Sequence, residues 1–161
     1  MGMNLIVDIG NSRIKVAIMS GGEVVEQYAF TSLQDLALDA ILSKYPTVER
    51  AIVASTGIDA QCVVRMLREK GLWAMEMTPS TPVPIRNGYL TPETLGMDRL
   101  AAAVGASHIV GGDCMIVDFG TAITIDFVVD GEYRGGNISL GVRSRFRALH
   151  DYTSRLPECE A

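Results

Sequence analysis

Residues 5–18, LIVDIGNSRIKVAI, decide the expected fold of this chain. The apolar run at residues 5–7 is typical of a buried strand, and it delivers the carboxylate of Asp8 to the carboxyl end of that strand. Gly10 permits a tight turn in which the backbone can approach a ligand closely. Apolar residues then alternate with others from Ile14 to Ile18, so we expect a second strand that forms a hairpin with the first.

The turn of this hairpin carries the groups that a phosphate site needs. Asn11, Ser12 and Lys15 supply hydrogen-bond donors, and the backbone N–H groups of such a turn can bind phosphate oxygens. The carboxylate of Asp8 can hold the Mg²⁺ that accompanies a phosphate. An ordinary β-turn uses the same residue types, so this stretch alone leaves both interpretations open.

The same pattern returns at residues 115–128, MIVDFGTAITIDFV. At a constant offset Asp8 aligns with Asp118 and Gly10 with Gly120. Further along, the same offset aligns Ile18 with Val128 and Gly21 with Gly131. Two copies of one supersecondary unit favour duplicated domains whose turns lie across one cleft and bind one ligand. The repeat therefore favours the phosphate interpretation over the ordinary turn.

The composition excludes several classes of function. A net charge of −5 with scattered basic residues gives no electrostatic footprint for nucleic acid. The most apolar long window, residues 100–110, is too short to span a membrane, and we expect no signal peptide. Cys62, Cys114 and Cys159 are widely spaced and odd in number, which is typical of reduced thiols in a cytoplasmic protein.

The remaining segments predict a mixed α/β sheet, because three strands are followed by alternating helices and strands. The first expected helix begins at Thr31 or Ser32 and ends before Pro46. The second runs from Asp59 to Glu69. The other expected elements are strands at 23–30, 51–54 and 72–77, a hairpin at 123–134, a short strand at 137–140 and a helix at 142–152.

Residues 78–92 are rich in proline and predict a connecting loop, and loops of this length are often functional. The loop leads into Asp98 and Arg99 at the start of an alanine-rich helix. An acid in the first turn of a helix has an ordinary explanation, because it interacts favourably with the helix dipole. The alternative is a substrate site, in which Asp98 accepts a proton from a hydroxyl group and Arg99 binds an anion. The spacing alone leaves both open.

Three motifs together resemble those of type III pantothenate kinases. They are DIGNS at 8–12 with Lys15, Y-x-x-P-x-x-L-G-x-D-R at 89–99, and D-x-G-T-A-x-T-I-D at 118–126. The second motif is the most discriminating, and further matches at 135–141 and 153–157 extend the resemblance to the whole chain. The resemblance implies an α/β fold of duplicated ribonuclease-H-like domains, as in actin-like ATPases, with mixed sheets flanked by helices.

The resemblance also implies a division of the chain into two domains. The first is expected at residues 1–112, with the phosphate turn at 8–15 and the substrate motif at 89–99, and the second at residues 113–161. The second copy is much shorter than the first, so we expect an incomplete second domain with partly exposed apolar side chains. The side chains concerned are Ile138, Leu140, Phe146, Leu149 and Leu156.

Roles for individual residues follow from the same resemblance. Asp98 is the expected general base, Asp8 the expected Mg²⁺ ligand, and Asp118 the expected ligand of a monovalent cation, K⁺ or NH₄⁺. The expected ATP contacts are Asp8, Gly10, Asn11, Ser12, Lys15, Gly120 and Thr121. The expected pantothenate contacts are Tyr89, Gly96, Met97, Asp98 and Arg99.

The implied function is ATP-dependent phosphorylation of pantothenate to 4'-phosphopantothenate, the first step of coenzyme A biosynthesis. The expected setting is a cytoplasmic homodimer that binds neither nucleic acid nor membrane. A non-catalytic nucleotide-binding or regulatory relative, inactive because of the short carboxyl terminus, is the alternative. A ribonuclease-H-like nuclease would use Asp8, Asp118 and Asp126 to hold two metal ions. The acidic balance and the paired phosphate turns argue against that class.

Overall fold

The computed structural model describes residues 2–57 and 60–160 of the chain. The described part divides into two compact units. The first comprises Met1–Thr81 and Gly96–Asp98, and the second comprises Pro82–Leu95 and Arg99–Ala161. This division follows packing within the chain and not the sequence repeat, so the expected domain boundary between residues 112 and 113 stays a prediction. Among the described residues, every helix is too short or too polar to cross a membrane.

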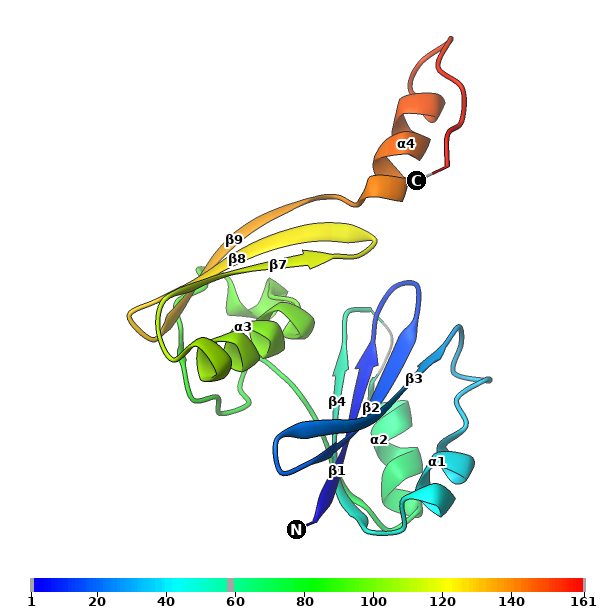
Figure 1. Ribbon diagram of the computed structural model, residues 1–161, viewed down its shortest axis with the longest axis vertical. Coiled ribbons are helices and arrows are strands. Elements are labelled where there is room, and N and C mark those ends of the chain that lie inside the picture. Colours follow the sequence, from blue (N-terminus) through cyan, green and yellow to red (C-terminus); the bar gives the residue numbers. More distant parts are fainter. Residues whose placement is uncertain (1, 58–59, 161) are drawn as a thin grey trace. The chain divides into compact units, whose positions relative to one another are not determined.

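The first unit is a mixed sheet with helices on one face (Figure 1). The strand order is β3-β2-β1-β4-β5, in which β1, β2 and β3 are antiparallel neighbours and β4 and β5 continue in parallel. The strands are β1 (Met3–Ile9), β2 (Ile14–Ser20), β3 (Glu23–Phe30), β4 (Val48–Ser55) and β5 (Trp73–Glu76). The helices are α1 (Leu38–Lys44) and α2 (Ala60–Glu69), and the expected start of α2 at Asp59 lies outside the described residues.

Alternation in the first two strands separates a core face from an open face. Leu5, Val7 and Ile9 in β1 are 0% exposed and pack in one core with residues of α1 and α2. Ile6, whose side chain points to the other face, is 37% exposed. Asp8 therefore lies on the open face of the sheet, because its two neighbours in β1 are both core residues.

The first helix begins later than the sequence predicts. The hydroxyl groups of Thr31 and Ser32 donate to the carboxylate of Asp35, at 2.8 and 2.7 Å. The backbone N–H of Asp35 donates back to the Ser32 hydroxyl at 3.3 Å. These side chains thus close a local turn and do not cap a helix, and α1 starts only at Leu38. The expected helix start at Thr31 or Ser32 is wrong for this reason.

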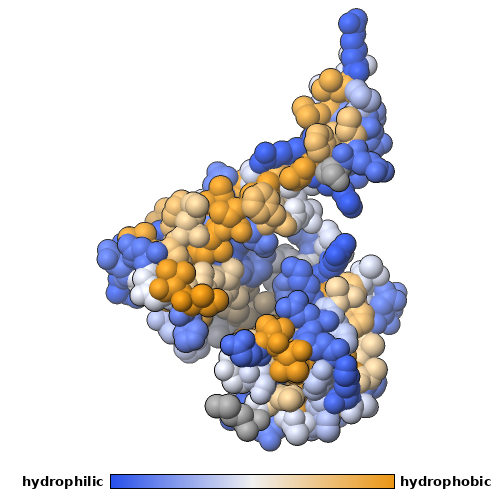
Figure 2. Space-filling view, in the orientation of Figure 1, coloured by the Kyte–Doolittle hydropathy of each residue, from blue (hydrophilic) through white to orange (hydrophobic). Residues whose placement is uncertain are grey.

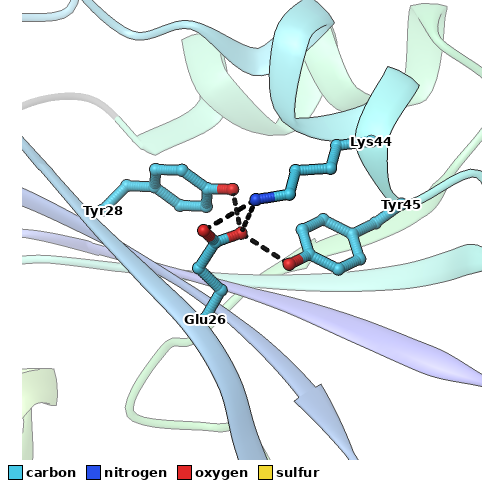
Figure 3. A network of polar contacts seen from close by, with 4 residues as sticks. All are labelled: Glu26, Tyr28, Lys44 and Tyr45. Atoms are coloured by element: carbon cyan, nitrogen blue, oxygen red, sulfur yellow. Dashed lines mark hydrogen bonds and ion pairs between the residues drawn. The ribbon is translucent and has the colours of Figure 1, made fainter.

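Helix α1 is fixed to β3 by a polar cluster that the sequence does not indicate (Figure 3). The carboxylate of Glu26 accepts hydrogen bonds from the hydroxyl groups of Tyr28 and Tyr45 and from the Lys44 ammonium group, the last at 2.8 Å to each carboxylate oxygen. These bonds, that of Lys44 foremost, lower the pKa of Glu26 from 4.5 to about 2. Glu26 thus stays charged through mildly acidic conditions.

We expect the Glu26 cluster to stabilise the fold only while Glu26 is ionised. Because the pKa is lower in the folded chain, its contribution is present above about pH 4.5 and is lost as the pH falls towards 2. Urea unfolding should show Glu26→Gln to be less stable than the wild type at pH 7, with the difference closing below pH 4.5. Glu23→Gln, an exposed carboxylate on the same strand, is the matched control. A difference that does not vary with pH would contradict the expectation.

The second unit is a sheet of order β6-β9-β8-β7, whose long strands are antiparallel. The expected loop at residues 78–92 contributes the short strand β6, which pairs in parallel with β9. The first strand of the expected hairpin is β8, and its second strand joins the expected short strand at 137–140 into one continuous strand, β9. The elements are β6 (Arg86–Asn87), the 3-10 turn at Pro92–Thr94, α3 (Met97–Val110), β7 (Cys114–Phe119), β8 (Ala122–Val129), β9 (Glu132–Leu140) and α4 (Val142–Asp151). Helix α3 begins within the first unit at Met97.

The two units repeat one three-stranded motif, down to its irregularities. The β2–β3 turn at Gly21 and Gly22 has φ of 60° and 92°, and the β8–β9 turn at Asp130 and Gly131 has φ of 52° and 69°. Positive φ at both central residues is the geometry of a type I′ hairpin. The pairing of β2 with β3 skips Val25, because the register shifts by one residue between Ile18 and Met19. The pairing of β8 with β9 skips Arg134 in the same way. The duplication is thus present in the strand pairing as well as in the sequence.

The register corrects the constant offset assumed from the sequence. Ile9 pairs with Ile14 around the first turn, whereas Phe119 pairs with Ile123 around the second, which is one residue shorter. Beyond the turns the equivalent of Ile18 is therefore Phe127, and not Val128. The offset holds from Asp8 to Gly10 and then decreases by one.

Equivalent faces of the two sheets are covered differently. Leu5, Val7 and Ile9 are fully buried in the first unit. Their equivalents Met115, Val117 and Phe119 are 62%, 39% and 72% exposed. In the second unit the opposite face is buried, and its side chains include Asp126, Val128 and Tyr133. Figure 2 shows apolar side chains gathered over these strands. The five side chains expected to be partly exposed in the second domain are partly or largely exposed in the structure. Two lie on β9, Ile138 and Leu140, and three lie on or after α4, Phe146, Leu149 and Leu156.

We expect this apolar face to cause self-association of the chain. Met115 and Phe127 are cross-strand neighbours on it, so Met115→Lys with Phe127→Glu places an opposite-charge pair across the two strands. Light scattering should show associated wild type and a largely monomeric double variant, since burying each apolar side chain is worth about 1.5–3 kcal/mol. Ile109→Lys on α3, where Ile109 is 84% exposed, is the control. A wild-type chain that is monomeric at high concentration would refute this.

Candidate functional site

The first glycine turn is closed by its own backbone. The N–H of Gly10 donates to the carbonyl of Arg13 at 3.0 Å, and the Asn11 and Ser12 side chains between them are exposed. A Cβ at position 10 would lie 3.3 Å from the Arg13 carbonyl oxygen, which is tighter than an ordinary contact. Glycine thus lets the turn close tightly, while Asn11 and Ser12 remain exposed to a ligand.

Asp8 lies at the edge of a hollow on the open face of the first sheet. It pairs with Lys15 across the hairpin, with 3.9 Å between the carboxylate and the ammonium group. The hollow has a volume of about 500 Å³, and Arg13, Gln27 and Tyr28 also line it. One partly exposed carboxylate between two basic side chains suits a phosphate group that arrives with a divalent cation.

A further polar segment, Ser55 to Gly57, lies beside this turn, and the sequence analysis missed it. Strand β4 pairs in parallel with β1, so Ser55 stands opposite Ile9. The N–H and the hydroxyl of Thr56 both donate to the Ile9 carbonyl, at 3.1 and 3.3 Å. The carboxyl ends of adjacent parallel strands are where α/β proteins commonly bind ligands. A Ser-Thr-Gly run directly after a buried strand was the available signal.

The second glycine turn is anchored on α4. The N–H of Gly120 donates to the Ala122 carbonyl at 2.9 Å. The carbonyl of Thr121 accepts bonds from the N–H of Gly141 at 3.0 Å and from the Ser144 hydroxyl at 3.2 Å. Asp118, Gly120 and Thr121 are all exposed. The turn therefore presents a carboxylate and a hydroxyl on a backbone held from behind.

The substrate motif surrounds a buried ion pair in the second unit. Arg99 and Asp126 are 6% and 2% exposed. The guanidinium donates twice to the carboxylate, from Nε to Oδ2 at 3.0 Å and from Nη2 to Oδ1 at 2.5 Å. The Tyr133 hydroxyl donates to the same Oδ1 at 2.7 Å. Arg99 is thus held in a fixed orientation by two side chains that are not among the expected pantothenate contacts.

Tyr89 completes this cluster. Its ring stacks on Tyr133 at 6.1 Å between centroids, and the Arg99 guanidinium lies 5.7 Å from its centroid. A Cβ at Gly135, where φ is 76°, would come within 2.8 Å of the Tyr89 ring. Glycine at position 135 therefore makes the space that Tyr89 occupies.

Burial and hydrogen bonding shift the pKa of Arg99 in opposite directions. Burial would lower its pKa, but the hydrogen bonds to Asp126 and the nearby charges outweigh burial and hold the pKa above its ordinary value. For Tyr133, burial and the hydrogen bond to Asp126 both raise the pKa. The guanidinium therefore stays charged and the phenol stays protonated at neutral pH.

The structure brings the expected site residues together in three groups. Asp8, Gly10 and Lys15 lie around the first turn with Asn11 and Ser12, and Asp118 lies with Gly120 and Thr121 at the second. Tyr89 and Arg99 form the third group. Gly96 and the buried Met97 precede half-buried Asp98 in the first turn of α3. That the two glycine turns share one ligand stays a prediction.

Comparison of the sequence with those of known proteins assigns the chain to a family. The sequence profile of type III pantothenate kinases matches residues 4–161. The chain belongs to the type III pantothenate kinase family. It is 44% identical to a type III pantothenate kinase of Phocaeicola vulgatus over 99% of its length, and 39% identical to one of Flavobacterium johnsoniae over 96%. It spans 66% and 64% of the length of these two relatives.

Several solved structures share the fold of this chain. A Baf family transcriptional activator from Campylobacter jejuni is similar with a TM-score of 0.57 at 20% identity, over 93% of this chain and 60% of that one. A Ppx/GppA phosphatase from Aquifex aeolicus gives 0.56 at 13% identity, over 99% and 58%. A 2-dehydro-3-deoxygalactonokinase from Sinorhizobium meliloti gives 0.52 at 15%, over 93% and 57%. The expected α/β actin-like ATPase fold is confirmed.

We expect the second turn to depend on glycine at position 141. A Cβ there would lie 2.2 Å from the Gly120 carbonyl oxygen, so Gly141→Ala must displace the turn. Urea unfolding should show a loss of about 1–3 kcal/mol, and the Gly120 amide should exchange faster with solvent. Gly105→Ala in α3, where no atom lies within 4 Å, should instead stabilise by about 0.5–1 kcal/mol. Equal stability of Gly141→Ala and the wild type would disprove the contact.

Proposed function

We propose that the protein transfers the γ-phosphoryl group of ATP to the primary hydroxyl of pantothenate, forming 4'-phosphopantothenate for coenzyme A biosynthesis. The proposal rests chiefly on the repeated glycine turn, which follows a carboxylate in both units of a chain of this kinase family. The N–H groups of Gly10 and Gly120 donate within their own turns, so other backbone N–H groups of the two turns would bind the phosphates. Asn11, Ser12, Lys15 and Thr121 would add side-chain donors.

Phosphoryl transfer proceeds through a loose transition state, so orientation and charge neutralisation carry most of the catalysis. Tyr89, Gly96, Met97 and Arg99 would hold pantothenate. Asp98 would accept the proton of its attacking hydroxyl group. The substrate motif thus supplies both the orientation of the acceptor and the base, in one loop and the first turn of α3.

The carboxylates fit the expected cations. At the first glycine turn Asp8 offers Mg²⁺ one carboxylate, and no cluster of three metal-binding side chains occurs among the described residues. Mg²⁺ commonly uses one or two carboxylates and completes its shell with waters and substrate phosphates. The bound ion would neutralise charge on the triphosphate. Exposed Asp118 would hold a monovalent cation, K⁺ or NH₄⁺. We further propose a cytoplasmic homodimer.

We expect Asp98→Asn to lower phosphopantothenate formation by about 10²–10⁴-fold, because the amide keeps the shape of the carboxylate but cannot accept a proton. The assay follows labelled pantothenate in the presence of ATP, with and without Mg²⁺. Glu93→Gln, an exposed carboxylate just before the motif helix, should leave the rate unchanged.

Turnover of folded Asp98→Asn at the wild-type rate would reduce Asp98 to a positioning role. A wild-type chain that binds ATP without forming phosphopantothenate would contradict the proposed function and support the regulatory alternative.

A further inference from the structure

We propose that Asp126 and Tyr133 are positioning residues for pantothenate, which act by holding the Arg99 guanidinium in its binding orientation. The inference rests on the proposed function and extends it to two side chains outside the substrate motif. Both belong to the sheet of the second unit, Asp126 to β8 and Tyr133 to β9.

The geometry favours a positioning role because the carboxylate holds one edge of the guanidinium and so fixes the plane of the whole group. The Asp126 carboxylate accepts one hydrogen bond from Nε of Arg99 and one from Nη2. A guanidinium has five N–H groups in a fixed plane, so fixing one edge also fixes the directions of the remaining donors. The guanidinium carbon lies over the ring of Tyr89, itself an expected pantothenate contact, at 5.7 Å from the ring centroid. The orientation of the guanidinium is therefore set relative to a second substrate residue.

Tyr133 limits the orientation of the carboxylate in turn. Its hydroxyl donates to Oδ1, the oxygen that also accepts from Nη2. Its side chain is 0% exposed, and its ring stacks on Tyr89. A fully buried phenol with a fixed ring gives the carboxylate little freedom to rotate. Arg99, Asp126, Tyr133 and Tyr89 thus form one connected cluster.

Stability alone is a weak explanation for such a cluster. Replacing a buried ion pair by apolar side chains of similar volume is often neutral or stabilising in proteins. In the first unit, the position equivalent to Asp126 is Ala17, so the repeated fold forms without a carboxylate there. The ion pair is therefore a feature of the unit that carries Tyr89 and Arg99, and not a requirement of the duplicated motif.

The test compares pantothenate with ATP in the full chain. Asp126→Asn should raise the KM for pantothenate by about tenfold or more, as expected for loss of a hydrogen bond between charged groups, while the KM for ATP stays within about twofold. Tyr133→Phe, which keeps the ion pair, should raise the pantothenate KM by about threefold. Asp113→Asn is the matched control, because Asp113 is an exposed carboxylate that accepts from the Asp130 N–H.

A double-mutant cycle decides whether Asp126 acts through Arg99. If it does, Arg99→Lys with Asp126→Asn should lose no more pantothenate affinity than the worse single variant. Additive losses, or parallel losses for ATP and pantothenate, would overturn the positioning role. Should Asp126→Asn not fold, Tyr133→Phe decides alone, and an unchanged pantothenate KM overturns it. Wild-type chain that neither binds nor phosphorylates pantothenate would instead refute the proposed function, and with it this inference.

Discussion

The second unit depends on a charge pair held away from water. Arg99 and Asp126 lie 27 positions apart, the first on helix α3 and the second on strand β8. Breaking such a pair from one side leaves an uncompensated buried charge, which costs about 3–5 kcal/mol. The ion pair therefore favours the arrangement of α3 against the sheet in which both charges are paired. The ion pair also fixes the position of the substrate motif, because Arg99 is the last residue of that motif.

The two copies of the three-stranded motif have the same local structure but are packed differently. In the first unit, α1 and α2 cover the face that carries Leu5 and Val7. In the second unit, that face is exposed and the other carries the ion pair. The strand pairing, the type I′ turn and the register shift are the same in both. What covers each sheet thus differs, while a glycine two residues after a carboxylate opens the turn in both, with the second turn one residue shorter.

The sequence predicted the strands and the turns well because their signals are local. Alternation around Ile14 and the glycine after each carboxylate are visible within a few residues. The predicted start of α1 was wrong because Thr31 and Ser32 can form a local turn as readily as they can cap a helix. Asp126 was not predicted beside Arg99 because strand order and helix packing, and not neighbouring residues, bring the two together. The Ser-Thr-Gly run at 55–57 did carry a local signal, which the prediction did not use. The constant offset failed because the second turn is one residue shorter, which shifts every equivalent position beyond it by one.

The repeated three-stranded motif also bears on how the chain folds. Its contacts join residues close in sequence, across turns that need little loop closure, so each copy can form early and by itself. The parallel pairing of β4 with β1 must wait for the crossover through α1. In the second copy, β7, β8 and β9 need no such crossover to pair. Folding of this chain is therefore expected to begin at two independent nuclei, with the parallel strands of the first unit joining afterwards.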